Sequence, residues 1–500
     1  MTDLKVKVLL VLLVIVGLFS SSMSGYAAEE ELPVIDKTLS GKLNGAEKPT
    51  IQPEDDIMKI AAKAGSVYPE FYRPKGGIVI DSLSGDVLWS ENPDKVWPIA
   101  SLSKLMTAYI VLDEISEGDL TLDSKFKVTD DIQAISQIYS LSNNKMVTGV
   151  EYTLRELLTI MLIPSSNAAT VMLSDVVSPG KRGEFIDKMN NMAEKLGMTK
   201  TKYYNSSGAT AASFEGLYNP EGYDPNGDNV STARDISILI YNFMKHHPEV
   251  LEFTKNPKVT VKSGTPYEET FESYVLSVEG NKYSFPGMDG LKTGSSPSAA
   301  FGYGATAVRD DKRFIEVLLG VGTWEEQNGE DIRFPIGNAL LDKMFKDYDY
   351  RKVLSKGENT ISGRDVILDD DVYALVKPEQ EFSVDFSENG IKIDTGLEGV
   401  SDKISAPTVK FKEKTLASNL GFDSDKTITE QFKTNKLIPL LMGLVGIVMI
   451  MLSRLVINLR RRKNARGGNL ITTVGILLGF ALVVVAIYFT LEQLLGGIFN

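Results

Sequence analysis

Three short motifs follow one another along the chain, and each carries side chains that can take part in acyl transfer. They are Ser101 and Lys104 in an S-x-x-K motif, Ser165 and Asn167 in an S-x-N motif, and Lys292-Thr293-Gly294. The first can supply a nucleophile with its base, the second a hydroxyl and an amide, and the third a cation for a carboxylate. Single motifs of these kinds also match elsewhere by chance, so their order and combination carry the prediction.

The composition leaves lysine as the base for a nucleophilic serine. The chain has no cysteine and two histidines, the adjacent His246 and His247, which precede Pro248 at an expected helix end. A cysteine nucleophile, a thiolate zinc site and a His-rich metallopeptidase site are therefore excluded. No G-x-S-x-G segment presents a serine to a histidine. We expect Lys104 to deprotonate Ser101, with no metal and no cofactor.

Ser101 and Lys104 are expected to share one face of a helix. Pro98-Ile99-Ala100 precedes Ser101 and places it in the first helical turn, where free N–H groups and the helix dipole favour an anion. Side chains three residues apart are neighbours on a helix, so Lys104 can reach Ser101. Lysine acts as a base only if its charged form is disfavoured, and burial near Lys292 would do this. A capping serine with a solvated lysine is the competing interpretation.

The second motif is expected on a loop between two helices. The apolar helix predicted over residues 153–163 ends at Pro164, so Ser165 and Asn167 would project from a loop that both helices hold in place. We expect Ser165 to relay a proton to the leaving amine and Asn167 to bind a substrate amide. Capping of the next helix is the competing interpretation of both residues.

The third motif is expected on an edge strand that lines the substrate. Strand alternation sends Lys292 and Gly294 to one face, and Thr293 can reach around the rim of an edge strand. Gly294 permits a close backbone approach, and the N–H of Ser295 can join that of Ser101 in an oxyanion hole.

The order of the predicted elements indicates an α+β fold. Residues 77–81 and 87–90 read as a hairpin, a series of helices follows, and residues 299–308 and 314–321 read as strands after the third motif. A strand pair, many helices and a strand meander predict an antiparallel sheet made by both ends of one domain, with helical layers.

We predict that this domain covers residues 57–350 after a flexible lead-in over residues 29–56. A small β-rich domain over residues 351–418 and a linker over residues 419–436 follow, and their position suggests a spacer between the first domain and the membrane. The net charge of −13 makes the chain a poor candidate for binding nucleic acid.

Both ends of the chain carry targeting signals. Residues 1–28 have the basic, apolar and small-residue parts of a secretory signal peptide. Residues 437–457 and 470–490 each have about the ~20 apolar residues of a spanning helix. The basic loop over residues 458–469 is predicted to be cytoplasmic, which anchors the C-terminus in the cell membrane with the domain of residues 57–350 outside. A helix on the membrane surface is the alternative for the second segment.

At the three motifs the chain resembles the low-molecular-mass penicillin-binding proteins, which are serine-type D-alanyl-D-alanine carboxypeptidases. The similarity extends to Ile99-Ala100 before Ser101, to Ser231-Thr232-Ala233-Arg234-Asp235 and to Asp289-Gly290, and it covers roughly residues 57–415. A trailing β domain with a C-terminal anchor is most similar to the penicillin-binding protein 4 type of Gram-positive cocci.

This resemblance implies a β-lactamase/transpeptidase-like fold and a serine acyl-enzyme. It implies that Ser101 attacks the D-Ala-D-Ala end of peptidoglycan stem peptides, that β-lactams are covalent inhibitors, and that Arg234 is a further ligand for the substrate carboxylate. Asn205-Ser206-Ser207-Gly208 departs from the Asn-Pro-His-Gly segment that the family often has, and we assign it no catalytic role. Two C-terminal spans are also unusual for the family.

Several functions stay open at this point. Carboxypeptidase and transpeptidase differ only in whether water or an amine accepts the acyl group. A β-lactamase shares the three motifs, but no E-x-x-L-N segment closely follows Asn167 to activate its water. A non-catalytic β-lactam sensor on a membrane stalk would need a signalling domain, for which residues 458–469 are too few.

Overall fold

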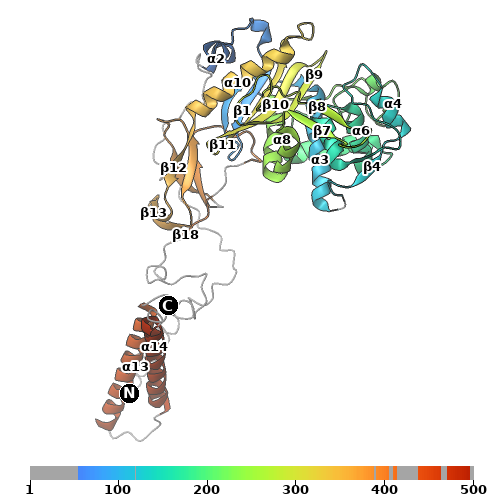
Figure 1. The fold of residues 1–500 in the computed structure, drawn as a ribbon. Helices are drawn as coiled ribbons and strands as arrows, with labels where there is room; N and C mark the ends of the chain where they lie inside the picture. Colours follow the sequence, from blue (N-terminus) through green and yellow to red (C-terminus); the bar gives the residue numbers. More distant parts are fainter. Residues whose placement is uncertain are drawn as a thin grey trace. The chain divides into compact units, whose positions relative to one another are not determined.

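The computed structural model describes residues 55–118, 120–387, 390–404, 409–413, 437–462 and 470–495 (Figure 1). The predicted signal peptide, the linker, nearly all of the lead-in and most of the basic loop lie outside these residues. Along the described chain, an α+β domain is followed by a small β domain and by two C-terminal helices.

A five-stranded antiparallel sheet runs through the α+β domain in the order β2-β1-β11-β10-β9. Its strands are β1 (Gly76–Asp81), β2 (Val87–Glu91), β9 (Met288–Ser296), β10 (Ala300–Arg309) and β11 (Lys312–Val321). The N-terminal hairpin meets the C-terminal meander where β1 pairs with β11, with Ile78 opposite Val317. This confirms the predicted sheet from both ends of the domain. Strand β9, which carries the third motif, is an edge strand of this sheet.

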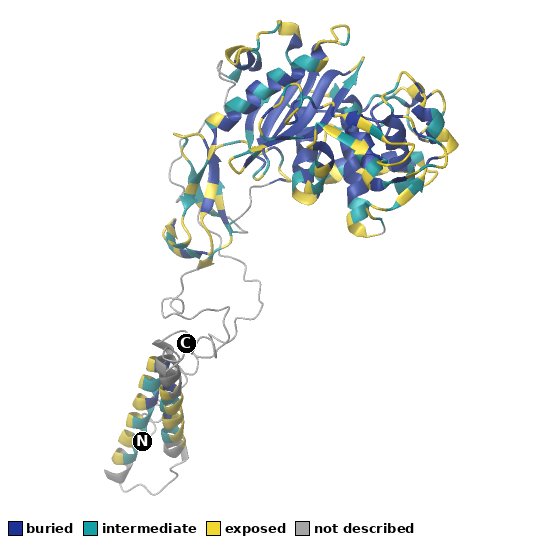
Figure 2. Cartoon of the chain, in the orientation of Figure 1, coloured by how far each residue is buried: buried dark blue, intermediate teal, exposed yellow. Residues whose placement is uncertain are grey.

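Helices cover both faces of the sheet, which is the most buried part of the domain (Figure 2). Neighbouring side chains on a strand point to opposite faces, so Ile78 joins one core and Val79 the other. The first core includes side chains of α3 (Ser103–Glu117) and α8 (Ala233–His246). The second includes side chains of α10 (Gly329–Asp347) and α2 (Ile57–Lys63). The sheet is thus the middle layer of three.

The remaining helices of this domain are α4 (Asp130–Ser136), α5 (Leu154–Leu162), α6 (Asn167–Val177), α7 (Arg182–Leu196) and α9 (Leu251–Thr254). Short strands pair as β3 (Trp97–Pro98) with β6 (Val230–Ser231), β4 (Lys125–Lys127) with β5 (Glu151–Thr153), and β7 (Lys258–Val261) with β8 (Glu269–Glu272). A capping box starts α5: Glu156 N donates to Thr153 Oγ1 at 3.1 Å, and Thr153 N donates to Glu156 Oε2 at 2.9 Å.

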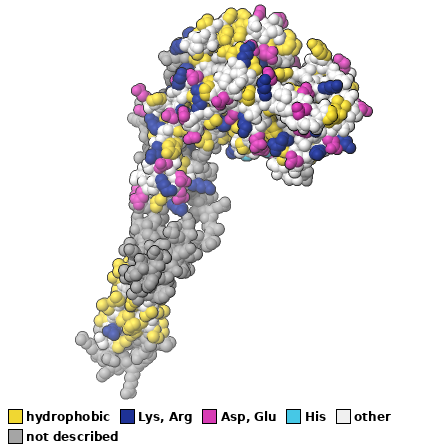
Figure 3. Space-filling model, in the orientation of Figure 1, with side chains coloured by type: hydrophobic (Ala, Val, Ile, Leu, Met, Phe, Trp, Pro, Cys, Tyr) yellow, Lys and Arg dark blue, Asp and Glu magenta, His cyan; other side chains and the backbone are white. Residues whose placement is uncertain are grey.

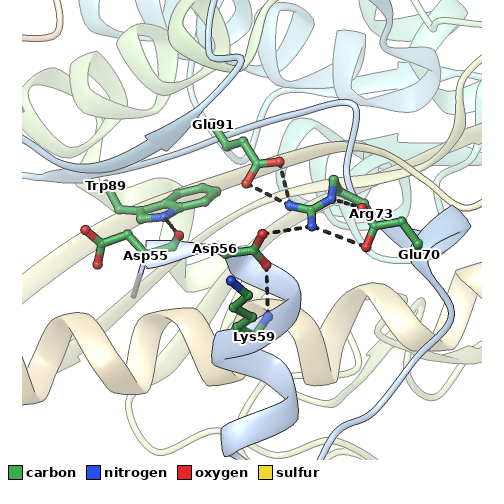
Figure 4. Close-up of polar contacts among 7 residues, drawn as sticks. All are labelled: Asp55, Asp56, Lys59, Glu70, Arg73, Trp89 and Glu91. Carbon is green, nitrogen blue, oxygen red and sulfur yellow. Dashed lines mark hydrogen bonds and ion pairs between the residues drawn. The ribbon is translucent and has the colours of Figure 1, made fainter. Parts of the chain in front are cut away.

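The α+β domain begins slightly earlier than predicted, because the last residues of the expected lead-in are held by the fold (Figure 4). Trp89 Nε1 donates to the carbonyl oxygen of Asp55 at 2.7 Å. Asp56 caps the N-terminus of α2 and also accepts a hydrogen bond from Arg73 at 2.9 Å. Arg73 in turn donates to Glu91 of β2 at 3.0 Å. These contacts tie α2 to the edge of the sheet.

The small β domain is built from short antiparallel strands. They are β12 (Asp349–Leu354), β13 (Gly357–Ile361), β14 (Arg364–Leu368), β15 (Val372–Val376), β16 (Ser383–Ser387), β17 (Gly390–Asp394) and β18 (Lys412–Glu413). Strand β12 pairs with β15, β14 with both β13 and β18, and β16 with β17. The β-rich character confirms the prediction. The boundary expected at residue 350 falls inside β12, because α10 ends at Asp347.

Residues 398–404, which we call the docking segment, join the β domain to the α+β domain. Val87 N donates to the Glu398 carbonyl at 2.8 Å, and Val400 N donates to the Gly85 carbonyl at 2.9 Å. Val400 and Ile404 are 1% and 9% exposed and belong to the first core. A Cβ at Gly85 would lie 2.5 Å from Ile404, so this contact requires glycine. The β domain therefore completes the α+β domain in addition to any role as a spacer.

The C-terminal helices α13 (Leu437–Arg462) and α14 (Leu470–Leu495) pack together through small residues. A Cβ at Gly446 would lie 2.6 Å from the carbonyl oxygen of Gly479. Exposed apolar side chains gather over these helices (Figure 3). Within the described chain, one helical stretch, Pro439–Asn458, is long and apolar enough to cross a membrane, with a mean hydropathy of 2.5. A shorter apolar stretch covers Val474–Ile487.

Replacing Ile404 with alanine is expected to destabilise the α+β domain, although this residue lies in the β domain. The lost side-chain atoms leave a cavity in the first core, which costs about 2 kcal/mol of unfolding free energy. Urea unfolding followed by tryptophan fluorescence measures the effect, because the 3 tryptophans of the chain all lie within residues 57–350. Val67→Ala, at a position 77% exposed, is the control. An unchanged midpoint for Ile404→Ala would mean that the two domains unfold independently.

Candidate active site

Ser101 lies in a 3-10 turn (η4, Ala100–Leu102) that leads directly into α3, as the sequence predicted. Ala100 has a φ of 44°, in the left-handed region that is strained for a residue with a side chain. Lys104 Nζ lies 2.9 Å from Ser101 Oγ. The predicted nucleophile and its predicted base are therefore in direct contact. The interpretation of Lys104 as a solvated surface lysine is wrong, because its side chain is fully buried.

The three hydrogen-bond partners of Lys104 determine which way a proton can move. Nζ lies 3.0 Å from Asn167 Oδ1 and 2.8 Å from the carbonyl oxygen of Ser207, and both oxygens only accept. Asn167 Nδ2 donates to the Ser142 carbonyl at 3.0 Å, which turns Oδ1 toward Lys104. A neutral amine has two N–H donors and one lone pair. In that neutral form, engagement of both donors by Asn167 and Ser207 would leave the lone pair for Ser101, whose hydroxyl could then give up its proton.

Burial disfavours the charged form of Lys104. Removal from water lowers the pKa of Lys104 well below its usual value of 10.5, and the neighbouring charge of Lys292 lowers it further. A desolvated lysine beside a second cation can serve as a general base.

The third motif approaches the nucleophile from the edge strand β9. A Cβ at Gly294 would lie 2.4 Å from the carbonyl oxygen of Ile99 and 3.1 Å from Leu102 N, so only glycine lets β9 come this close. Thr293 lies opposite Tyr303 of β10, which belongs to the second core. Gly294 thus faces the Ser101 side of the sheet, as the strand alternation predicted.

Lys292 is a fully buried lysine whose charged form lowers the pKa of Lys104. Its Nζ donates to the carbonyl oxygen of Thr293 at 3.1 Å. Burial lowers the pKa of Lys292 to about 7, and the positive charge of Arg333 contributes to the shift. Its ammonium form is poorly solvated, so a substrate carboxylate would replace the hydration that Lys292 has lost.

Ser165 occupies the predicted loop between α5 and α6. Its φ is 62°, and its Oγ is buried without a hydrogen-bond partner among the residues that the structure describes. Ser166, in contrast, caps α6, because its Oγ accepts from Ala169 N at 3.2 Å. The capping interpretation therefore applies to Ser166. The backbone of Ser165 is strained, and its hydroxyl has no partner in the described chain, so this hydroxyl is available for proton transfer.

The segment Asn205-Ser206-Ser207-Gly208, to which we assigned no role from sequence, lies against the nucleophile. The Ser207 carbonyl accepts from Lys104, and the Ser206 carbonyl accepts from Thr107 Oγ1 at 2.7 Å. Gly208 has a φ of 89°, and a Cβ there would lie 1.8 Å from the carbonyl oxygen of Ala100. The sequence signal was weak, because the contact uses backbone carbonyls and a glycine.

Arg333 of α10 is a site residue that no motif indicated. It is 1% exposed, and its Nη1 donates to Ser295 Oγ and to the Gly302 carbonyl, each at 3.0 Å. Burial lowers the pKa of Arg333 to about 10, so it stays cationic at neutral pH. Its Nε is buried without a partner in the described part of the chain. Only packing of α10 against the sheet brings this cation to the end of β9.

The structure places Arg234 in the first turn of α8. Its Nε donates to Asp94 at 3.2 Å, its Nη2 pairs with Glu398 at 3.6 Å, and its Nη1 donates to the Val400 carbonyl at 3.3 Å. Arg234 therefore links α8 to the docking segment. The arginine that contacts Ser295 is Arg333, and the role of Arg234 as a carboxylate ligand stays a prediction that rests on the family resemblance.

The chain matches a family model described as D-alanyl-D-alanine carboxypeptidase over residues 66–323. This match contains all three motifs and ends before Arg333. A domain of unknown function matches residues 350–412, which correspond to most of the β domain.

The D-alanyl-D-alanine carboxypeptidase DacF of Bacillus subtilis is 25% identical over 299 residues, 57% of this chain and 66% of that protein. A D-alanyl-D-alanine endopeptidase of Escherichia coli is 31% identical over 219 residues, 43% of this chain and 62% of that protein. The chain thus spans less than two thirds of both relatives. A solved structure, a peptidoglycan synthesis regulatory factor (PBP3) from Streptococcus pneumoniae, is 23% identical with a TM-score of 0.58 and covers 68% of this chain and 97% of that one. This likeness shows a shared fold.

Lys292→Met is expected to stabilise the folded protein in a pH-dependent way. The pKa of Lys292 is about 7 in the folded chain and has its usual value of 10.5 when the chain unfolds. Between these pH values the unfolded chain binds more protons, so the stability of the wild type rises with pH. In urea unfolding, the gain in unfolding free energy of Lys292→Met over the wild type should therefore be larger at pH 7 than at pH 9.5. A difference that does not change with pH would contradict the buried, poorly solvated state of Lys292.

Proposed function

The chain belongs to the D-alanyl-D-alanine carboxypeptidase family, and we propose that it removes the terminal D-alanine from peptidoglycan stem peptides through a Ser101 acyl-enzyme. The observation that carries this proposal is the buried Lys104 amine, whose Nζ lies 2.9 Å from Ser101 Oγ, 3.0 Å from Asn167 Oδ1 and 2.8 Å from the Ser207 carbonyl oxygen. That arrangement suits proton abstraction from serine without a histidine or a metal.

Acylation begins when Ser101 Oγ attacks the carbonyl carbon between the two D-alanines and its proton passes to Lys104 Nζ. The carbonyl oxygen becomes an oxyanion between the N–H groups of Ser101 and Ser295. The close approach of β9 to η4 at Gly294 supports this placement. Collapse of the intermediate breaks the peptide bond, and Ser165 passes a proton to the departing D-alanine amine. The proton that Lys104 holds replaces the one that Ser165 gives.

Substrate binding uses the cations at the end of β9. We assign the terminal carboxylate of the stem peptide to Lys292, Thr293 and Arg333, because both cations are buried and lie close to this strand. The side-chain amide of Asn167, which also orients Lys104, borders the peptide backbone of the substrate. Gly294 keeps the strand close enough for these contacts.

Release of the acyl group requires a second nucleophile. Water gives the carboxypeptidase product, and an amine of another stem peptide gives a crosslink. In either case the acyl–Oγ bond breaks and Ser101 recovers its proton. A β-lactam is attacked in the same way, and its ring opens to leave an ester on Ser101.

We further propose that the enzyme acts at the outer side of the cell membrane. The apolar stretch Pro439–Asn458 supports a C-terminal anchor. The glycine contacts between α13 and α14 support a helical hairpin in which α14 also spans. The basic residues between these helices favour a cytoplasmic position for the loop.

Release of D-alanine from a pentapeptide ending in D-Ala-D-Ala tests the reaction with the purified full-length protein. Ser101→Ala should lower turnover by at least about 10³-fold. Ser124→Ala is a matched control, because Ser124 and Lys127 form a second S-x-x-K motif. The hydroxyl of Ser124 accepts a hydrogen bond from Thr121 N and is no part of the proposed site. This variant should keep full activity.

The same preparation separates the alternatives. A long-lived adduct with labelled penicillin is expected, whereas rapid hydrolysis of the antibiotic would identify a β-lactamase. An adduct without turnover of the pentapeptide would identify a sensor. If the protein forms neither free D-alanine nor a crosslinked dimer from the pentapeptide, the proposed reaction is refuted.

The two arginines give a test of the carboxylate site. Arg333→Met should raise KM for the pentapeptide by about 10- to 100-fold, which corresponds to losing a charge-assisted hydrogen bond of about 1.5–3 kcal/mol. Arg234→Met should leave KM unchanged and lower thermal stability, because Arg234 joins α8 to the docking segment. A rise in KM for Arg234→Met alone would instead support Arg234 as the carboxylate ligand, as the family resemblance implies.

A further inference from the structure

We propose that Asn229 is a positioning residue that holds the Ser101 turn and the carbonyl partner of Lys104 in one fixed arrangement. The inference rests on the proposed acyl-serine reaction. Asn229 lies directly before β6, is 1% exposed and belongs to none of the three motifs.

The side chain of Asn229 is fully used in hydrogen bonds. Its Nδ2 donates to Ser103 Oγ at 2.8 Å and to the carbonyl oxygen of Asn205 at 2.9 Å, with Asn205 Oδ1 at 3.3 Å. Its Oδ1 accepts from Tyr204 N at 2.7 Å and from Asn205 N at 3.1 Å. A buried carboxamide with donors and acceptors on different segments fixes those segments relative to each other.

One branch of this network leads to the nucleophile. Ser103 Oγ donates to the carbonyl oxygen of Ala100 at 2.7 Å, and Ile99 N donates to the carbonyl oxygen of Asn229 at 3.0 Å. Both sides of Ser101 are thus tied to Asn229. The left-handed conformation of Ala100 is costly and persists only where the surroundings impose it. These hydrogen bonds are part of what imposes it.

The other branch leads to the base. Asn205 Oδ1 accepts from Ser207 N at 3.2 Å and from Gly208 N at 2.6 Å, which orients the peptide that carries the Ser207 carbonyl. That carbonyl accepts from Lys104 Nζ at 2.8 Å. Through Asn205, Asn229 therefore determines the direction of one N–H of Lys104, and with it the direction of the lone pair.

Because both branches lead to Ser101 and Lys104, a change at Asn229 is expected to slow acylation and to leave the binding of the substrate unchanged. Proton transfer from Ser101 to Lys104 depends on the geometry of both groups, and a displacement of about 1 Å can cost about 10²-fold in rate. The proposed carboxylate site uses Lys292 and Arg333, which come from β9 and α10, and neither of their side chains is hydrogen-bonded to Asn229. Binding of the substrate carboxylate should therefore survive when Asn229 is changed.

Asn229→Asp tests this, because it keeps the shape of the side chain and removes both Nδ2 donors. Stopped-flow acylation of the full-length protein by a fluorescent penicillin separates the Kd of the initial complex from the first-order acylation rate constant. We expect the rate constant to fall by about 10- to 100-fold while Kd stays unchanged. Asn338→Asp is the matched control: Asn338 Nδ2 donates to the Tyr283 carbonyl at 2.8 Å and its Oδ1 accepts from Ser277. This control should acylate at the wild-type rate.

Ser103→Ala is the second variant, and it tests the positioning role of Asn229 if Asn229→Asp does not fold. It removes one link between Asn229 and the Ser101 turn and should lower the acylation rate constant by a smaller factor, again at constant Kd. Wild-type acylation rates in folded Asn229→Asp or in Ser103→Ala would overturn the proposal. An equal fall in the acylation rate constant of Asn338→Asp would also overturn it. Failure of the wild type itself to form an adduct would instead refute the acyl-serine function.

Discussion

The burial of a lysine amine among neutral partners is the constraint on which the proposed site depends. Lys104 is fully buried, and its partners are the neutral hydroxyl of Ser101, the carboxamide of Asn167 and the carbonyl of Ser207. A carboxylate in that position would favour the ammonium form and remove the base. The positive charge beside it, on Lys292, works in the same direction as burial. Neutral partners and the neighbouring Lys292 together suit Lys104 to the role of general base that we propose for it.

This requirement explains why several separate segments converge on one short helix start. Glycines stand where two backbones approach too closely for a Cβ: Gly294 brings the edge strand to the nucleophile turn, and Gly208 brings the Ser207 carbonyl to Lys104. The strained residues Ala100 and Ser165 are each next to this site in the sequence: Ala100 precedes Ser101, and Ser165 lies two residues before Asn167, which contacts Lys104. Strain is tolerated here because the buried network around these segments leaves no better arrangement.

The β domain is part of the same physical unit. Val400 lies in the first core of the α+β domain, and Tyr350 OH donates to Asp81 at the end of β1 at 2.9 Å. Arg234 adds a charged link between α8 and Glu398. The match to the family model ends at residue 323. The first core extends further along the chain, because Val400 and Ile404 belong to it and cover apolar side chains that would otherwise meet water. A domain of unknown function thus has at least a structural role in this chain.

The sequence by itself determined the features that depend on local spacing. The contact between Ser101 and Lys104 follows from the helical repeat, and the two faces of β9 follow from strand alternation. The choice of lysine as base follows from composition. Only the tertiary structure decided which arginine stands beside Ser295, which carbonyl orients Lys104, and where the α+β domain ends. The physical reason is that these contacts join distant segments through packing and backbone groups: a carbonyl such as that of Ser207 has no signature in the sequence, and Arg333 reaches β9 only because α10 packs on the sheet.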